Sequence, residues 1–130
     1  MLRFLRGLSV VTLSLAIATG SAAASEPMRR HDMTDAERGA VEAKMKRMLR
    51  DPSSAQFEDV GAMIDGDTLF VCGRLNAKNL YGGYVGFQPF YGRMAVSAGR
   101  PVFDLTSIGD DKQKAHSVGM ACARKGMLVY

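Results

Sequence analysis

Two cysteines and two histidines are the residues of this 130-residue chain whose types could support covalent or metal chemistry. Cys72 and Cys122 lie far apart in the sequence, and so do His31 and His116. Zinc sites draw their ligands from short spacings such as C-x2-4-C, so this spacing predicts no metal site. His31 beside Asp32 supplies only two ligands. The sequence indicates no cofactor either.

The first residues, 1–24, have the composition of a signal peptide for export. Two arginines supply the positive start, an apolar run over 8–19 follows, and Ala22 and Ala24 place small side chains where a signal peptidase needs them. A membrane anchor would need about 20 predominantly apolar residues, and this run is shorter. We therefore predict cleavage after Ala24 and a mature chain that is periplasmic or secreted and does not span a membrane.

Export decides between two roles for the cysteines. The periplasm and the medium oxidise thiol pairs, so an exported chain with two cysteines most simply joins them. We predict a Cys72–Cys122 disulfide. The alternative is a small periplasmic hydrolase or thiol enzyme using Cys72 or His116. A thiolate nucleophile needs a base and an orienting group, and one histidine at unknown distance supplies neither geometry.

Charge and the remaining motifs exclude several classes of function. The chain has 17 basic and 13 acidic residues, and the predicted signal peptide contains two of the basic ones. Basic residues form no long run, so the sequence predicts no binding to nucleic acid. No G-x-G-x-x-G, G-x-S-x-G or H-E-x-x-H motif occurs, and the acidic residues are scattered. We therefore predict no catalytic residues, although a site assembled from distant residues would be invisible in the sequence.

The stretch from Val71 to Met94 concentrates the unusual residues. It holds five of the ten aromatic residues and five of the 14 glycines. Its segment 76–83 is rich in asparagine and glycine, which suit tight or left-handed backbone, and this predicts an exposed loop. Tyrosines here suit either the core or a binding surface, since they combine apolar area with a polar tip. The candidate binding residues are Asn76, Lys78, Asn79, Tyr81, Tyr84 and Tyr91.

The elements that position these residues begin with a helix. The polar segment 25–33 lacks periodicity and is predicted to be a flexible lead-in. Thr34 and Glu37 have the spacing of a capping box. An apolar stripe follows at helical spacing, and Pro52 would stop it. The pattern predicts a helix over 35–50.

The rest of the chain predicts an α+β fold, as a single domain over 34–130. The strand at 68–75 is apolar on both faces, which suggests a central place, with Phe70 and Cys72 on one face and Val71 on the other. A C-terminal helix would dock on it through Cys122. The fold is then an N-terminal helix, an antiparallel sheet of three to four strands and a C-terminal helix over 110–125. The predicted strands are 57–64, 68–75, 84–96 and 100–105.

Three segments together resemble a family of small exported bacterial proteins of uncharacterised function. They are D-P-S-S-A-Q-F at 51–57, V-C-G-R-L-N-A-K-N at 71–79 and G-G-Y-V-G-F at 82–87. The resemblance covers roughly 41–94, about half of the predicted mature chain. It implies a shared fold and carries no activity or catalytic residue.

The sequence as a whole predicts a small, disulfide-stapled and non-enzymatic binding module of the cell envelope. The aromatic and polar surface over 76–91 would bind an envelope protein, a peptide or a glycan.

Overall fold

The computed structural model of the protein describes residues 20, 21 and 23–129. The predicted signal peptide, 1–24, lies outside the described residues except at 20, 21, 23 and 24. The strands are β1 (Arg29–His31), β2 (Gln56–Asp65), β3 (Thr68–Asn76), β4 (Gln88–Ser97) and β5 (Arg100–Ile108), and the helices are α1 (Asp35–Lys46), the short 3-10 helix η1 (Pro52–Ser54) and α2 (Lys112–Arg124).

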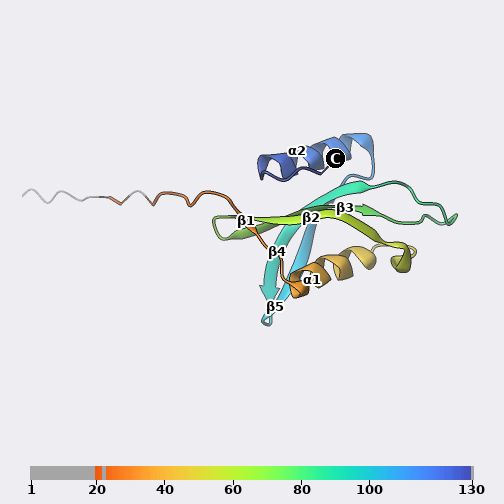
Figure 1. Cartoon of the computed structure of the whole chain (residues 1–130), viewed down its shortest axis with the longest axis horizontal. Helices are drawn as coiled ribbons and strands as arrows, with labels where there is room; N and C mark the ends of the chain where they lie inside the picture. The colour runs from red at the N-terminus through yellow and green to blue at the C-terminus, as the bar shows by residue number, and fades with distance from the viewer. Residues whose placement is uncertain (1–19, 22, 130) are drawn as a thin grey trace, which may run out of the picture.

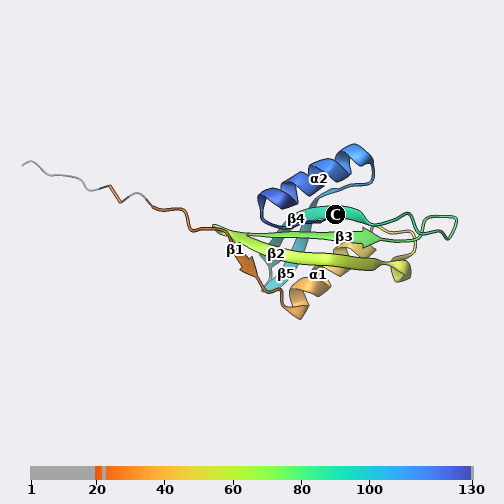
Figure 2. The ribbon, with the colours of Figure 1, turned by 45° about the horizontal axis from the view of Figure 1, so that its top comes forward.

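The strands form one antiparallel sheet in the order β1-β2-β3-β4-β5. The two helices lie on opposite faces of this sheet, with α1 below it and α2 above it in Figure 1. Figure 2, turned by 45°, shows the same separation. The α+β prediction is therefore confirmed. No helix among the described residues has the length and apolar character needed to cross a bilayer.

The predicted number of three to four strands is too low, because residues 29–31 of the predicted flexible lead-in form β1. This strand pairs with Ala62–Ile64 of β2. It is fixed further by His31, whose Nε2 lies 2.9 Å from Oε2 of Glu37 in α1. A strand of three residues is too short to show an alternating sequence pattern, and it forms because the partner strand β2 pairs with it.

The larger core lies between α1 and the sheet. The capping box is present as predicted: the Glu37 N–H donates to Oγ1 of Thr34, and the Thr34 N–H donates to the Glu37 carboxylate. The helix ends at Lys46 rather than near residue 50. Its fully buried side chains, Val41 and Met45, pack with residues of β2 to β5. The other buried members of this core are Met33, Ala62, Val71, Leu75, Phe90 and Phe103.

Strand β3 is central, with paired strands on both sides. Val71 belongs to the α1 core and Cys72 to the cluster under α2, so the two faces are assigned as predicted. The next residue, Gly73, leaves space for the ring of Phe90 from β4. A Cβ at this position would lie 2.7 Å from that ring and 2.9 Å from the Val60 side chain. The strand therefore needs glycine here to keep its aromatic neighbour in the core.

The smaller cluster lies between α2 and the sheet. Cys72 and Cys122 form the predicted disulfide, with their Cα atoms 6.1 Å apart. Val118 and Val129 complete the buried cluster, and Tyr91 packs against it. This cluster has fewer buried apolar side chains than the α1 core, and the disulfide joins α2 to β3 covalently.

Candidate binding surface

The β3–β4 loop, residues 77–87, is a small hairpin that extends beyond the sheet at one end of the molecule (right in Figure 1). Lys78 and Tyr84 form an isolated antiparallel bridge. The Asn79 N–H donates to the Gly83 carbonyl at 2.9 Å, and the Gly82 N–H donates to the Asn79 carbonyl at 3.1 Å. These bonds close a turn over residues 79–82.

The Asn79 side chain holds this turn from inside. Its Oδ1 accepts hydrogen bonds from the N–H groups of Tyr81 at 2.9 Å and of Gly83 at 3.2 Å. Gly82 adopts a φ of +77°, which a residue with a Cβ rarely takes. The side-chain oxygen of Asn79 is thus already hydrogen-bonded within the loop, and this residue holds the backbone of its neighbours in place.

The base of the loop is anchored by Asn76. This residue is 8% exposed, and its Oδ1 accepts a hydrogen bond from the Gly86 N–H at 3.0 Å. Its Nδ2 donates to Oε1 of Gln56 at 3.4 Å. Asn76 was predicted to contact a partner, but it is buried and its side-chain amide joins both ends of the loop. Its role is therefore structural.

A second anchor joins the loop to η1. The buried hydroxyl of Ser54 accepts from the Lys78 N–H at 2.9 Å and donates to the Asp51 carbonyl at 2.8 Å. The Ser53 hydroxyl donates to the Asp51 carboxylate, and this hydrogen bond lowers the pKa of Asp51. The segments 51–57, 71–79 and 82–87 therefore meet at the base of the loop, each supplying part of one hydrogen-bond network.

The side chains at the end of the loop are strongly exposed. Tyr81 is 94% exposed and Leu80 is 68% exposed, while Tyr84 and Val85 are about half exposed. The Lys78 ammonium lies 5.6 Å from the centre of the Tyr84 ring. We call Leu80 and Tyr81 the loop tip. Leu80 and Tyr81 therefore lie in solvent on a backbone that hydrogen bonds to the Asn79 side chain hold in place.

The structure divides the six predicted binding residues. Lys78, Tyr81 and Tyr84 lie on the outside of the loop, whereas Asn76 and Asn79 hold it together. Tyr91 lies in β4 and packs against the disulfide cluster, away from the loop.

Sequence reasoning missed part of this surface. Leu80 lies in the loop predicted over 76–83 but was not named as a binding residue, although an apolar residue in an exposed loop has no core to face. Val85 lies within the predicted surface over 76–91 but was not singled out there. Met48 lies outside that range and comes to line the groove beside the loop only through the fold.

A groove of about 270 Å³ lies beneath the loop, where the chain that follows α1 passes under it. Its floor is apolar and includes the buried Leu75 and Ala77. Two cations, Arg50 and Lys78, stand on its rim. The remaining lining residues are Met48, Leu49, Asn79, Val85, Gln88 and Ile108.

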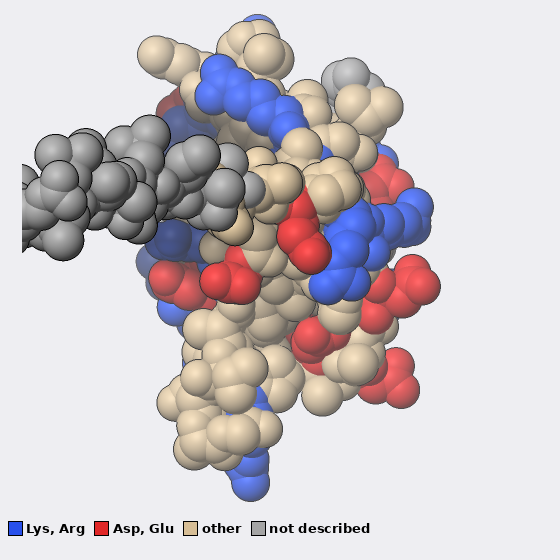
Figure 3. All heavy atoms as spheres, turned by 90° about the vertical axis from the view of Figure 1, so that its left-hand side faces the viewer, with Lys and Arg blue, Asp and Glu red and all other residues tan. Residues whose placement is uncertain are grey.

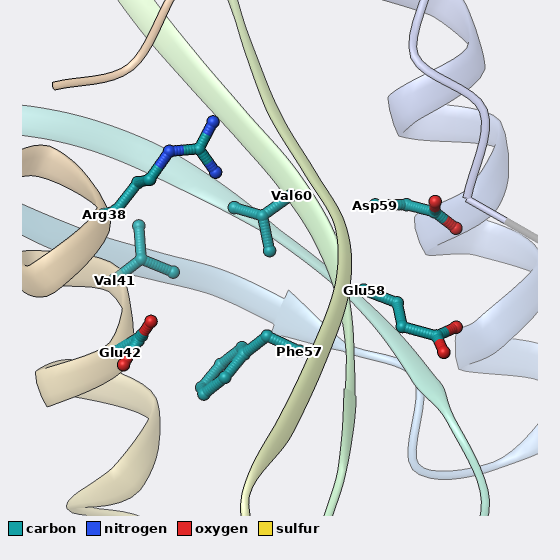
Figure 4. Close-up of a pocket in the computed structure, with 7 residues that line it drawn as sticks. All are labelled: Arg38, Val41, Glu42, Phe57, Glu58, Asp59 and Val60. Atoms are coloured by element: carbon teal, nitrogen blue, oxygen red, sulfur yellow. The ribbon is translucent and has the colours of Figure 1, made fainter. Parts of the chain in front are cut away.

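A second pocket, of about 360 Å³, lies between α1 and β2 (Figure 4). Phe57 and Val60 point toward α1, whereas Glu58 and Asp59 point away from it. Both carboxylates contact the Arg74 guanidinium, at 2.7 and 2.8 Å. These neighbouring acids therefore form an ion-paired cluster at the β2 bulge rather than a free pair for acid–base work.

The other candidate chemistry remains separated in space. Cys72 is 2% exposed and is bonded to Cys122, while His116 lies on the exposed side of α2. No group of three histidine, cysteine, aspartate or glutamate side chains among residues 20, 21 and 23–129 is placed to hold a metal ion.

No protein-family model, curated protein or solved structure matches this chain.

Proposed function

We propose that the protein is an exported binding module that contacts another macromolecule of the cell envelope through the β3–β4 loop and catalyses no reaction on it. The observation that carries this proposal is the loop tip. Leu80 and Tyr81 face solvent on a backbone that is already fixed by the Asn76 and Asn79 side chains. A contact surface ordered before binding loses less conformational entropy when the partner arrives.

Export is supported by two independent features. Residues 1–24 have a signal-peptide composition, and the Cys72–Cys122 disulfide is the form that an oxidising compartment favours. A periplasmic or secreted location follows from this proposal. An envelope protein, a peptide or a glycan is the corresponding class of partner.

The thiol-enzyme alternative is disfavoured by the state of Cys72. Its sulfur is bonded to Cys122 and the residue is buried, so no thiolate is available in this form. His116 lies on a different element, on its exposed side.

A cross-linking experiment in the native envelope tests the loop directly. The full chain would be expressed in its own host, cross-linked, recovered by a tag and compared with a Leu80→Ser/Tyr81→Ser variant. Because hot-spot residues dominate an interface, we expect capture of the partner to fall at least about tenfold.

The matched control is Val96→Ser/Val102→Ser. Val96 is 76% exposed and Val102 is also exposed, at the end of the β4–β5 hairpin. At the bottom of Figure 3 that end shows uncharged atoms and a basic side chain at its lowest point, whereas acidic and basic side chains are mixed above it. The control should capture the partner normally. Equal capture by both variants, or a loss confined to the control, would contradict the proposal.

Export has its own test. The amino-terminal residue of the protein recovered from the periplasm or the medium should be Ser25. An uncleaved chain in the cytoplasm would contradict this part of the proposal.

A further inference from the structure

We infer that the groove beneath the β3–β4 loop takes an apolar side chain from an acidic peptide segment. The inference rests on the proposed function and specifies the partner as a peptide, whether free or part of an envelope protein.

The size of the groove points to a single anchoring side chain. Pockets for whole small molecules usually measure about 300–1,000 Å³, and this groove measures about 270 Å³. Its floor, Leu75 and Ala77, is buried and apolar. Its outer walls, Met48 and Val85, are half exposed. An apolar side chain placed there would cover these walls and remove them from water, which is favourable in proportion to the area covered.

The charged residues on the rim determine which peptide residues fit beside the anchoring side chain. Arg50 approaches from the chain after α1 and Lys78 from the loop, and no acidic residue lines the groove. Asp51 does not line the groove, but its carboxylate stays charged: the Ser53 hydroxyl and, more weakly, the charge of Lys78 lower the pKa of Asp51, so Lys78 is already partly balanced by it. Two cations flanking an apolar floor complement an aspartate or glutamate on either side of the anchor.

The pocket between α1 and β2 provides the internal contrast. It is of similar size and is lined by one cation, Arg38, and by the carboxylate of Glu42. Its other acidic residues, Glu58 and Asp59, point away from α1 and pair with Arg74. With Glu42 beside its single cation, this pocket offers an acidic peptide no net positive charge. The difference in charge, more than the difference in shape, therefore assigns the acidic segment to the groove.

The walls of the groove are fixed before any ligand binds. The Lys78 N–H is held by the Ser54 hydroxyl, and the Val85 N–H donates to the Ala77 carbonyl at 3.4 Å. Since these backbone groups are already paired, we expect recognition through side chains rather than through addition of a strand.

A peptide selection tests the inference without knowledge of the natural partner. The mature full chain, with its disulfide intact, would be used to select from a phage-displayed library of random peptides. The enriched peptides should share a large apolar residue with aspartate or glutamate within a few positions. Peptides without this acidic bias, or no enrichment at all, would overturn the inference.

Charge reversal sharpens the test. A variant with Arg50→Glu and Lys78→Glu should bind the selected acidic peptides at least about tenfold more weakly and should itself select basic ones. The matched control, Arg93→Glu with Arg100→Glu, changes two exposed cations of β4 and β5 and should leave both results unchanged. Equal binding by the wild type and the groove variant would overturn the inference.

Failure here is distinguishable from failure of the proposed function. If the loop tip is required for capture of the native partner but charge reversal in the groove has no effect on that capture, the peptide assignment is wrong and the binding module stands. If capture does not depend on the loop tip, the proposed function itself is wrong.

Discussion

Two regions that share strand β3 are held in opposite ways. At Cys72, a covalent bond closes a small buried cluster against α2. At Asn76, at the end of the same strand, backbone N–H groups of the β3–β4 loop donate to asparagine side-chain oxygens and hold the loop, while its tip stays in solvent. We call the first region the stapled face. The disulfide keeps apolar side chains buried against α2, whereas the hydrogen bonds of the loop keep Leu80 and Tyr81 exposed in a fixed position. Substitutions should therefore reduce stability in the first region and binding in the second.

The largest effect is expected from removal of the staple. Cys72→Ala with Cys122→Ala should lower the free energy of unfolding by about 2–4 kcal/mol, because the cross-link closes a long segment of the unfolded chain. Urea denaturation with circular dichroism would measure the loss. Binding by the folded fraction should be retained. An unchanged denaturation midpoint would show that packing alone holds α2.

A smaller effect is expected at the base of the loop. Asn76→Ala should cost about 0.5–1.5 kcal/mol, because it removes the hydrogen bond between the buried Asn76 side chain and the exposed Gly86 N–H. Hydrogen exchange should show faster exchange at Gly86. The exposed Asn79→Ala serves as the comparison: it should loosen residues 81–83 with less effect on global unfolding. Equal losses from both variants would remove the distinction between base and turn.

Acid should destabilise the fold from a third place, the junction of β1 and α1. Burial raises the pKa of Glu37, but hydrogen bonds from the Thr34 N–H, the His31 ring and the Thr34 hydroxyl together outweigh it, and the net pKa lies below its ordinary value of 4.5. As the pH falls, Glu37 is therefore protonated in the unfolded state at a higher pH than in the folded state. This contribution is complete above pH 4.5 and is lost as the pH falls through the lower folded pKa.

Denaturation of the wild type and of Glu37→Gln would be measured between about pH 3 and pH 6. This pH range extends about one unit or more on either side of the ordinary pKa of a carboxylate. The variant should be less stable above pH 4.5 and should show a weaker pH dependence below it. Parallel curves for the two proteins would contradict the assignment to Glu37.

The smallest effect on stability is expected at the loop tip. Leu80→Ser with Tyr81→Ser removes side chains that are mostly in solvent, so the free energy of unfolding should change by no more than about 0.5 kcal/mol for each. Urea denaturation would check this before any binding experiment. A large loss would mean that the tip is part of the fold, and the contrast with the stapled face would fail.

The sequence predicted those features whose cause is local. The capping box of Thr34 and Glu37 and the two faces of β3 follow from spacing along the chain. The disulfide followed from the predicted compartment and the number of cysteines. In contrast, β1 depends on pairing with Ala62–Ile64, which no pattern in three residues can reveal.

The candidate site was predicted only in its position along the chain. Asparagine-rich composition indicated a loop, but it does not tell whether an amide such as that of Asn76 points inward to the backbone or outward to a partner. Tyr81 and Tyr91 likewise have the same chemistry and opposite places, one in solvent and one against the disulfide cluster. The groove was invisible because Arg50 and Lys78 become neighbours only after the chain folds.

The most direct test of the central claim is a hydrogen-exchange footprint of the protein with and without its captured envelope partner. The partner should slow exchange at the backbone amides of residues 77–86 and leave those of α2 and of the β4–β5 turn unchanged. Protection of α2 or of that turn, with the β3–β4 loop exchanging as in the free protein, would contradict the account.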